Sequence, residues 1–446
     1  MLSPTMARVD RLHIGIFGRI NAGKSTFMNV LTQQETSIVD PTPGTTTDIK
    51  AAVMEVHALG PVKLLDTAGL DEGEALGAKK RGKTLSALEQ VDLAVLVVDP
   101  VQALQSGKLQ IEEEVATACR RLGHALVMVC NVRADHEAAL HACGATLDQA
   151  VDHCKSALAD RAGTPVLVID LTQESALPAV VDLLTRGRPS PSKAVELLPF
   201  VGGQAPVLLH IPLDEESPSQ RLLRPQEMAM EYLLRLRVPV GMARVDLKLA
   251  RSGNPVMAGH ERDKFLRFFE KLGGAGDVQL VLTDSQAIDV MHDWLPAEVP
   301  LTTFSVMMIH QTCCGNLSLF AQGTRTLDTL QAGDRVLIAE ACNHDRMAED
   351  IGTVQIPRKL EQRIPGIVID HAFGREFPDK QSLQAYKLAI HCGGCMISKQ
   401  QASARVLRLA EAGIPVSNYG MVLAWFQGTS ALERVLRPWL PSLPSP

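Results

Sequence analysis

The sequence predicts an α/β protein with an N-terminal P-loop domain, a small β-α-β domain and a C-terminal doubly wound parallel-sheet domain. A strand-like segment at 13–17 leads into the glycine-rich loop 18–25 and then into a helical pattern, which is the context of a P-loop. Residues 186–192 (Arg-Gly-Arg-Pro-Ser-Pro-Ser) have the composition of a linker. From about residue 277 strands alternate with helices, which predicts a parallel, doubly wound sheet. We therefore expect domains at 1–188, 189–272 and 273–446.

The composition favours a globular protein without a nucleic-acid or membrane partner. Of 446 residues, 46% are hydrophobic and 21% are charged, and the formal net charge of −6 provides no basic field for nucleic acid. The longest apolar runs, such as 93–98, have the length of a strand, and the first residues lack the apolar core of a signal peptide. Nine irregularly spaced cysteines do not suit a disulfide framework. We expect a cytoplasmic protein with four cysteines in the core of its first domain: Cys119, Cys130, Cys143 and Cys154.

The glycine-rich loop carries the residue types that bind a nucleotide's phosphates. Backbone N–H groups of such a loop, together with the N-terminus of the following helix, cradle phosphate oxygens. Lys24 is expected to reach the β- and γ-phosphates and Ser25 to ligate Mg²⁺. The residues expected to line the site are Gly18, Asn21, Ala22, Gly23, Lys24, Ser25 and Thr26.

Two later segments fit a switch that senses the γ-phosphate. The polar loop 43–48 contains Thr45 and Thr46, and Thr46 is expected to close on Mg²⁺ when a γ-phosphate is present. Residues 62–69 read as a strand that ends in Asp66, placed for the metal shell, and in Gly69, whose N–H contacts the γ-phosphate. Lys24, Thr46 and Gly69 are therefore the residues expected to act in hydrolysis.

These three elements together resemble the translation-factor-like GTPases, especially the subgroup containing Era and the tRNA-modification GTPase MnmE. The resemblance implies GTP and GDP as ligands, Mg²⁺, and an activating K⁺ bound with help from Asn21. Such GTPases carry Asn-Lys-x-Asp after a later strand, where the aspartate pairs with guanine and the lysine stacks under it. Residues 131–135 read Asn-Val-Arg-Ala-Asp, so the lysine is missing and Asp135 lies one residue late. Asn131 and Asp135 are expected to face the base, and selectivity for guanine is left open.

The middle segment predicts a small unit that a second copy of the chain completes. Residues 205–214 read as a strand, a helix opens at Pro225, and residues 243–249 read as a second strand. A β-α-β unit of about 70 residues buries only a small core by itself. We expect a homodimer built mainly by residues near 200–265.

The carboxyl-terminal strands are expected to end in polar side chains. Strand ends fall at 283–285, near 309–310, and at 341–342, 391–392 and 417–420. Because the carboxyl ends of parallel strands line one rim, where open α/β sheets bind their ligands, Cys342, Cys392 and Asn418 are expected on a single rim.

Two of these strand ends carry metal-ligand patterns. Residues 391–395 read His-Cys-Gly-Gly-Cys and residues 342–344 read Cys-Asn-His. A Cys-x-x-Cys pair also suits a redox dithiol, and cysteine with histidine also suits structural zinc. Three thiolates together with two histidines favour an iron–sulfur cluster that has one non-thiolate or open position. The expected ligands are Cys342, Cys392, Cys395, His344 and His391.

Over essentially its whole length the chain resembles the HydF family of [FeFe]-hydrogenase maturation GTPases. Besides the metal motif, the resemblance rests on Thr-Asp-Ser-Gln-Ala at 283–287 and Asp-Arg-Val-Leu-Ile-Ala-Glu-Ala-Cys at 334–342. It implies that the three cysteines bind a [4Fe–4S] cluster, with the two histidines as further motif residues. It also implies a scaffold or carrier that accepts a di-iron precursor and delivers it to apo-[FeFe]-hydrogenase, with radical SAM maturases as partners. The alternative is an Era- or MnmE-like RNA or ribosome-assembly GTPase with structural zinc, although the carboxyl-terminal part shows no basic run or aromatic platform.

Overall fold

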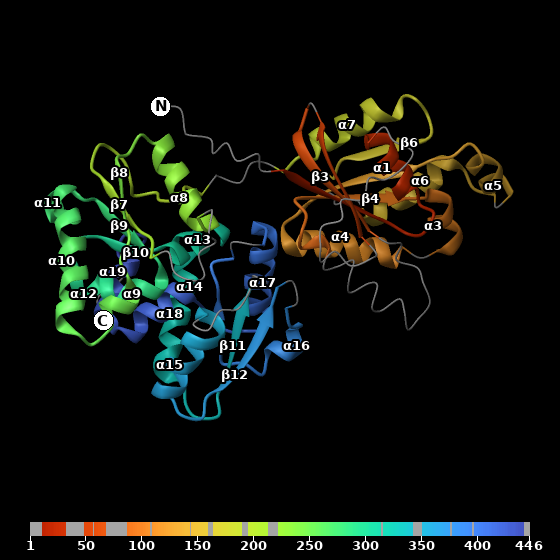
Figure 1. The fold of residues 1–446 in the computed structure, drawn as a ribbon. Helices are drawn as coiled ribbons and strands as arrows, with labels where there is room; N and C mark the ends of the chain where they lie inside the picture. The colour runs from red at the N-terminus through yellow and green to blue at the C-terminus, as the bar shows by residue number, and fades with distance from the viewer. Residues whose placement is uncertain are drawn as a thin grey trace. The chain divides into compact units, whose positions relative to one another are not determined.

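The computed structural model forms two compact units that divide between residues 193 and 194. It describes residues 11–32, 49–56, 58–67, 87–107, 109–142, 144–158, 164–189, 195–212, 222–313, 315–341, 350–374, 377–394 and 397–440. Figure 1 draws the elements of both units and labels many of them. The finer division into three domains stays a prediction.

The first unit is a six-stranded sheet with associated helices. Its strand order is β2-β3-β1-β4-β5-β6, and all neighbouring strands are parallel except β2 and β3. The elements are β1 (Leu12–Phe17), α1 (Lys24–Thr32), β2 (Ile49–Val56), β3 (Gly60–Thr67), β4 (Leu93–Val98), α3 (Pro100–Ser106), α4 (Gln110–Leu122), β5 (Ala125–Asn131), α5 (His136–Ala142), α6 (Leu147–Leu158), β6 (Val166–Ile169) and α7 (Ala176–Arg186).

The strand order of this sheet places the P-loop at a reversal point. Strand β1 has β3 on one side and β4 on the other, so the chain changes direction across the sheet at β1. Every residue of β4 is buried, which explains why its sequence is a continuous apolar run. Open α/β sheets bind ligands at such reversal points. The loop after β1, which the sequence predicts to bind phosphate, therefore lies at a ligand-binding position of the sheet.

Three cysteines of the first unit are core residues, as expected. Cys119, Cys130 and Cys154 are buried and free. Burial disfavours the thiolate and raises the pKa of Cys119 and of Cys154 to about 12 and that of Cys130 to about 11. Such thiols are chemically inert. Cys143 lies outside the described residues.

The second unit holds two four-stranded parallel sheets. Its helices and strands are β7 (Val207–His210), α8 (Arg224–Arg235), β8 (Val240–Ala243), α9 (Leu247–Ala250), α10 (Pro255–Lys271), α11 (Gly274–Asp277), β9 (Leu280–Thr283), α12 (Ile288–Trp294), β10 (Leu301–Thr303), α13 (Phe304–Thr312), α14 (Leu317–Thr324), β11 (Arg335–Glu340), α15 (Ile356–Arg363), β12 (Val368–Phe373), α16 (Lys380–Leu383), β13 (Leu388–His391), α17 (Lys399–Glu411), β14 (Val416–Asn418), α18 (Tyr419–Phe426) and α19 (Thr429–Leu436). A π-helical turn, Ile351–Gln355, precedes α15.

The middle sheet, with order β10-β9-β7-β8, is larger than the sequence indicated. The expected β-α-β unit is present as β7-α8-β8, and β9 and β10 extend it by pairing beyond β7. The strand expected at 243–249 is wrong: β8 ends at Ala243, and residues 247–250 form α9. Asp246 caps that helix by accepting the N–H of Leu249 at 3.0 Å.

The strand expected to end near 309–310 is also wrong, because these residues belong to helix α13. Thr303 caps this helix by accepting the N–H of Val306 at 3.2 Å. Most residues of α13 are buried, so its apolar residues do not mark a single face and its sequence lacks a helical period. A short apolar run of this kind does not distinguish a buried helix from a buried strand.

The carboxyl-terminal sheet has the predicted doubly wound, parallel topology. Its order is β12-β11-β13-β14, so the chain moves from β11 to β12 on one side and to β13 and β14 on the other. The register pairs Ala339 with His391 and His391 with Asn418. The described strand ends therefore share one rim, and the reversal point falls between β11 and β13.

Helix α19 and the residues after it complete the middle sheet. The buried Arg434 guanidinium donates hydrogen bonds to the backbone oxygens of His292, Leu295, Pro296 and Val299. The Thr302 hydroxyl at β10 donates to the Val435 oxygen at 3.0 Å and accepts the Trp439 indole N–H at 2.8 Å. These bonds tie β10 and α12 to a much later part of the chain.

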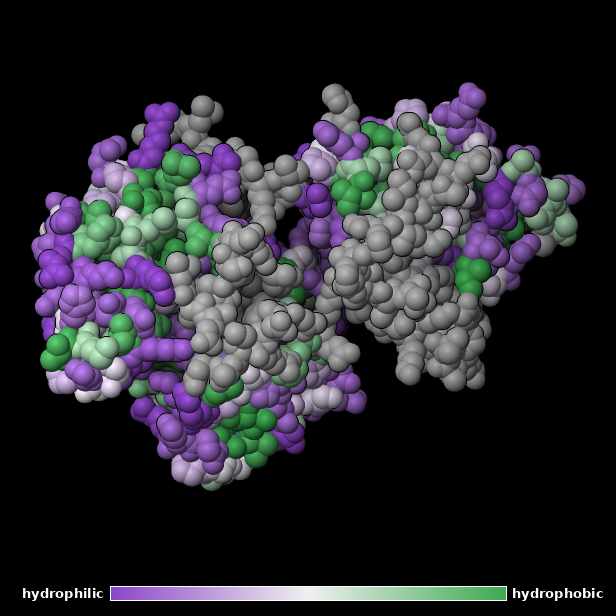
Figure 2. Space-filling view, viewed as in Figure 1, coloured by the Kyte–Doolittle hydropathy of each residue, from purple (hydrophilic) through white to green (hydrophobic). Residues whose placement is uncertain are grey.

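Hydrophobic side chains gather over β7 to β9 and α8 on the face shown in Figure 2. Leu234, Val240 and Met242 on α8 and β8 are 76%, 38% and 52% exposed. Since β8 is an edge strand, this apolar region lies at the edge of the middle sheet. Across the described ranges, every helix is too short or too polar to traverse a lipid bilayer.

We expect His210 to make the second unit sensitive to acid. It is fully buried at the end of β7, 2.8 Å from the Thr283 hydroxyl, and desolvation lowers its pKa from 6.5 to about 3. The unfolded chain therefore binds a proton below pH 6.5 that the folded chain does not, so stability is complete above that pH and falls toward pH 3. The contribution lost between pH 7 and pH 5 is about 2 kcal/mol.

Urea unfolding of the wild type and His210→Gln at both pH values measures this contribution. Between pH 7 and pH 5, the unfolding free energy of His210→Gln should fall by about 2 kcal/mol less than that of the wild type. The exposed His260→Gln serves as the matched control and should follow the wild type. Identical pH dependence in His210→Gln and the wild type would contradict the prediction.

Candidate functional site

Two glycines of the P-loop occupy positions that a larger residue cannot take. Gly18 has φ +149, and a Cβ there would lie 2.2 Å from the Val97 carbonyl oxygen. Gly23 has φ +106, and its Cβ would lie 2.3 Å from Nδ2 of Asn131. The loop can therefore pass closely over β4 and Asn131 only with glycine at both positions. Helix α1 then begins at Lys24, which brings its N-terminal N–H groups to the loop.

The predicted phosphate-binding residues lie together on this loop. Lys24 is 8% exposed and donates from Nζ to the Arg19 backbone oxygen at 2.7 Å. The Arg19 side chain forms a bidentate ion pair with the buried Glu112 of α4, at 2.7 and 3.2 Å. Asn21 and Ser25 are exposed, and Ala22 is buried. The ammonium group and the exposed loop residues thus lie on one loop, and their binding of phosphate stays a prediction.

Asp66 lies beside the strand that delivers the P-loop. The register pairs Ile16 with Asp66, and the Thr67 hydroxyl donates to the Ile16 oxygen at 2.7 Å. Asp66 is therefore at the rim where a magnesium ion between Ser25 and the phosphates would need a carboxylate. Thr45, Thr46 and Gly69 lie outside the described residues, so their roles stay predictions.

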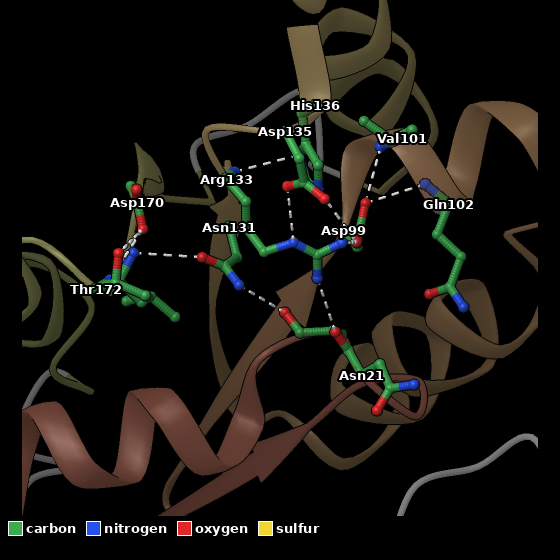
Figure 3. Close-up of polar contacts among 12 residues, drawn as sticks. Asn21, Asp99, Val101, Gln102, Asn131, Arg133, Asp135, His136, Asp170 and Thr172 are labelled. Carbon is green, nitrogen blue, oxygen red and sulfur yellow. Dashed lines mark hydrogen bonds and ion pairs between the residues drawn. The ribbon is translucent and has the colours of Figure 1, made fainter. Parts of the chain in front are cut away.

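Asn131 joins the P-loop to the loop after β6, as Figure 3 shows. It is 4% exposed, donates from Nδ2 to the Ala22 oxygen at 3.0 Å, and accepts the Leu171 N–H at 3.3 Å. Asp135 is 74% exposed and lies 3.4 Å from Nε of Arg133. The two residues expected to face the base therefore differ in exposure. Asn131 is buried and links two loops, whereas Asp135 is exposed and accessible to a ligand.

Sequence reasoning missed three residues at this end of the site. Asp99 is 6% exposed, and its Oδ2 lies 3.3 Å from Nη2 of Arg133 and 3.5 Å from Nε2 of His136. The signal for Arg133 was present, because it is a basic residue within the segment that lacked the expected lysine.

His391 and Cys392, at the end of β13, are the described part of the expected metal centre. Cys392 is 7% exposed, and its Sγ accepts the N–H groups of Ala341 at 3.1 Å and Gly394 at 3.4 Å. Cys342, His344 and Cys395 lie outside the described residues. Within the described ranges, no group of three or more His, Cys, Asp and Glu side chains is arranged to hold a metal ion.

The buried imidazole of His391 has a fixed orientation. Its Nδ1 lies 2.7 Å from the Cys392 carbonyl oxygen, which only accepts, so Nδ1 carries the hydrogen. Among the described residues, Nε2 has no hydrogen-bond partner although the side chain is fully buried. A buried imidazole whose Nε2 has no partner among the described residues, beside a buried thiol, fits a metal or cluster ligand set.

Asn418 holds this strand end against two other elements. Its Oδ1 accepts from the Ser305 hydroxyl at 3.2 Å and the Gly420 N–H at 2.9 Å, and its Nδ2 donates to the His391 oxygen at 3.2 Å. The rim of the carboxyl-terminal sheet is thereby joined to α13 and α18. Asn418, expected on this rim, acts there as a support for His391.

A glycine-rich loop at the reversal point of a parallel sheet, with Lys24 at the loop and Asn131 bracing it, defines a P-loop GTPase. A family model described as "50S ribosome-binding GTPase" matches residues 13–132. The models "Hydrogen maturase F dimerization domain" and "Hydrogen maturase F tetramerization domain" match residues 260–312 and 318–438. The chain belongs to the hydrogen maturase F (HydF) family.

Curated relatives resemble the GTPase part. The GTPase Der of Rhizobium johnstonii is 36% identical over 120 residues, which cover 26% of this chain and 24% of that protein. The tRNA modification GTPase MnmE of Natranaerobius thermophilus is 37% identical over 100 residues, 22% of this chain and 21% of that protein. The chain thus spans about a quarter of the length of the curated relatives it matches. A crystal structure of Aquifex aeolicus Era bound to GDP and aluminium fluoride has a TM-score of 0.30 and 16% identity, covering 58% of this chain and 97% of that one.

Proposed function

We propose that the chain is a GTP-hydrolysing scaffold for maturation of [FeFe]-hydrogenase. In this proposal Cys342, Cys392 and Cys395 bind a [4Fe–4S] cluster, where a di-iron precursor is received and then passed to apo-hydrogenase. Radical SAM maturases are the proposed suppliers of that precursor. The matches to two hydrogen maturase F domains and a GTPase domain support the proposal.

The observation that carries the proposal is the position of the Cys392 sulfur. Two backbone N–H groups, from Ala341 and Gly394, are directed at it, and such bonds stabilise a thiolate and tune cluster sites. The chain continues from these residues directly into Cys342 and Cys395. Cys342 and Cys395 are therefore each adjacent in sequence to a residue whose N–H bonds this sulfur. This short separation supports a centre with three thiolates.

His391 fits the remaining coordination position. Its Nδ1–H bond to the Cys392 oxygen sets the tautomer and directs Nε2 to ligand binding. When bound, the cluster supplies an iron whose fourth ligand is exchangeable. Imidazole would be a weaker ligand for that iron than thiolate, which would leave this position open to incoming cargo. His344 is the other histidine proposed for this position.

The first unit is proposed to hydrolyse GTP with Mg²⁺. Ser25 and Asp66 would hold the metal ion, and Lys24, Thr46 and Gly69 would contact the γ-phosphate. We assign an activating K⁺ to Asn21, whose exposed side chain and φ of +63 present it at the outside of the loop. Charge on both ions would then offset charge that develops during phosphoryl transfer.

The two matching hydrogen maturase F models are named for dimerisation and tetramerisation, and we propose a homodimer built mainly by residues near 200–265, which include β8 and α8. The exposed apolar side chains Leu234, Val240 and Met242 support this choice. The small size of the β-α-β unit does not support the homodimer, because β9 and β10 complete its sheet.

Iron, sulfide and zinc analysis of anaerobically purified protein tests the proposed function. We expect about four iron and four sulfide per chain, with little zinc. Stoichiometric zinc without sulfide would overturn the scaffold proposal and favour a ribosome-assembly or RNA GTPase. GTP hydrolysis, measured on the same sample, reports the nucleotide site separately from the metal centre.

A further inference from the structure

The guanidinium group of Arg133 lies at the centre of the polar contacts in Figure 3. Its Nη1 donates to the Asn21 oxygen of the P-loop at 3.4 Å, its Nε lies 3.4 Å from Oδ1 of Asp135, and its Nη2 lies 3.3 Å from Oδ2 of Asp99. Because the side chain is still 41% exposed, part of it remains open to a ligand.

A single extra residue explains the unusual sequence of this segment. The N–H of Val132 donates to the Ile169 oxygen at 2.8 Å, which continues the pairing of β5 with β6 by one residue. Arg133 and Asp135 follow with one residue between them, and the turn closes through the His136 N–H to the Arg133 oxygen at 3.0 Å. The basic residue and the carboxylate are therefore displaced together, and their mutual spacing is kept.

We propose that Arg133 is the residue that positions a guanine base in this chain. The inference rests on the proposed GTP site. The exposed part of the guanidinium offers a flat cationic surface on which a purine stacks, and its Nε–H holds the Asp135 carboxylate. That carboxylate accepts the N1–H and 2-amino groups of guanine, whereas adenine has an acceptor at N1 and no amino group at position 2.

Equilibrium competition of GDP and ADP against a fluorescent GDP analogue tests this assignment. The wild type should bind GDP at least about 100-fold more tightly than ADP. In Arg133→Ala, GDP binding should weaken by about 10-fold, and the GDP-over-ADP ratio should fall with it. Arg133→Lys should keep most of the ratio while losing part of the affinity. During GTP hydrolysis, Arg133→Ala should raise KM with kcat nearly unchanged.

A double-mutant cycle separates base positioning from a structural role. Asp135→Ala should also lower the GDP-over-ADP ratio. The double variant, Arg133→Ala with Asp135→Ala, should lower that ratio little further, since both changes act on one contact. The matched control is Arg186→Ala, which removes an exposed arginine paired with Asp182 on α7. Thermal unfolding midpoints of all variants should stay at the wild-type value.

Equal loss of GDP and ADP affinity in Arg133→Ala would make Arg133 a clamp on the P-loop and overturn the assignment. Equal binding of GDP and ADP by the wild type would also overturn it, while leaving the phosphate site intact. Failure of the wild type to bind either nucleotide would instead overturn the proposed nucleotide function.

Discussion

Replacing Lys24 by alanine is expected to lower kcat for GTP hydrolysis by about 100- to 1,000-fold. The Lys24 ammonium lies 2.7 Å from the Arg19 oxygen of the P-loop, and in the proposed function it is the cation that contacts the phosphates. Its charge is worth most in the transition state, where negative charge builds on the transferring group. Phosphate release at saturating GTP, with Mg²⁺ and K⁺ present, measures the effect.

Lys155→Ala is the matched control for this experiment. Lys155 lies on α6 of the same unit, is 44% exposed, and pairs only loosely with Asp152 at 3.9 Å. The Lys155→Ala protein should hydrolyse GTP at the wild-type rate. A Lys24→Ala protein within about twofold of the wild type would show that the catalytic site lies elsewhere.

Replacing Cys392 by serine is expected to remove most of the bound iron and sulfide. The change keeps the size of the side chain but exchanges a soft thiolate for a hydroxyl, which is a poor ligand for iron–sulfur clusters. The Ala341 and Gly394 N–H groups that now bond the sulfur would face an oxygen instead. Iron and sulfide per chain, measured after anaerobic reconstitution, should fall to about a quarter of the wild-type values or less.

Cys313→Ala is the control for the loss of a buried thiol in the same unit. Cys313 is 8% exposed and ends helix α13, with its sulfur 3.7 Å from the His310 oxygen. It should retain wild-type iron and sulfide. A Cys392→Ser protein with a full complement of both would remove Cys392 from the proposed ligand set.

The elements that sequence predicted well are those defined by neighbouring residues. The P-loop follows from a strand, two glycines with steric necessity and a helix start, all within residues 12–32. The pairing of β7 with β9 brings together His210 and Thr283, 73 residues apart, and no local pattern specifies that partner. The sequence of helix α13 predicts a strand because burial of most of its residues removes the helical period. Helix α9 has a local sequence signal, the capping residue Asp246.

Among the candidate site residues, too, those that a local spacing identifies were predicted, whereas roles that depend on distant contacts were not. Asn131 and Cys392 were found because a fixed spacing identifies them, and the structure adds the partners that the spacing cannot supply. Arg133 does not stand at the motif's usual spacing, because the fold absorbs an extra residue in the pairing of β5 with β6. Asn418 was placed on the correct rim, but its support of His391 depends on a contact 27 residues away.

The attachment of residues 434–439 to Thr302 and α12 sets the order in which the chain can mature during synthesis. The six strands of the first unit are complete once residue 169 has left the ribosome, so this unit can fold while the remainder is still being made. The four strands of the middle sheet are all present after Thr303, but the residues that bond to Thr302 follow more than 130 positions later, as the 133-residue separation of the Thr302–Val435 bond shows. During that interval the apolar strands β7 to β10 lack part of their cover, which is the stage at which a nascent chain needs a chaperone. The proposed nucleotide site can therefore form on a chain that is still on the ribosome, whereas the unit that carries the proposed metal centre is complete only once residues 434–439 have emerged.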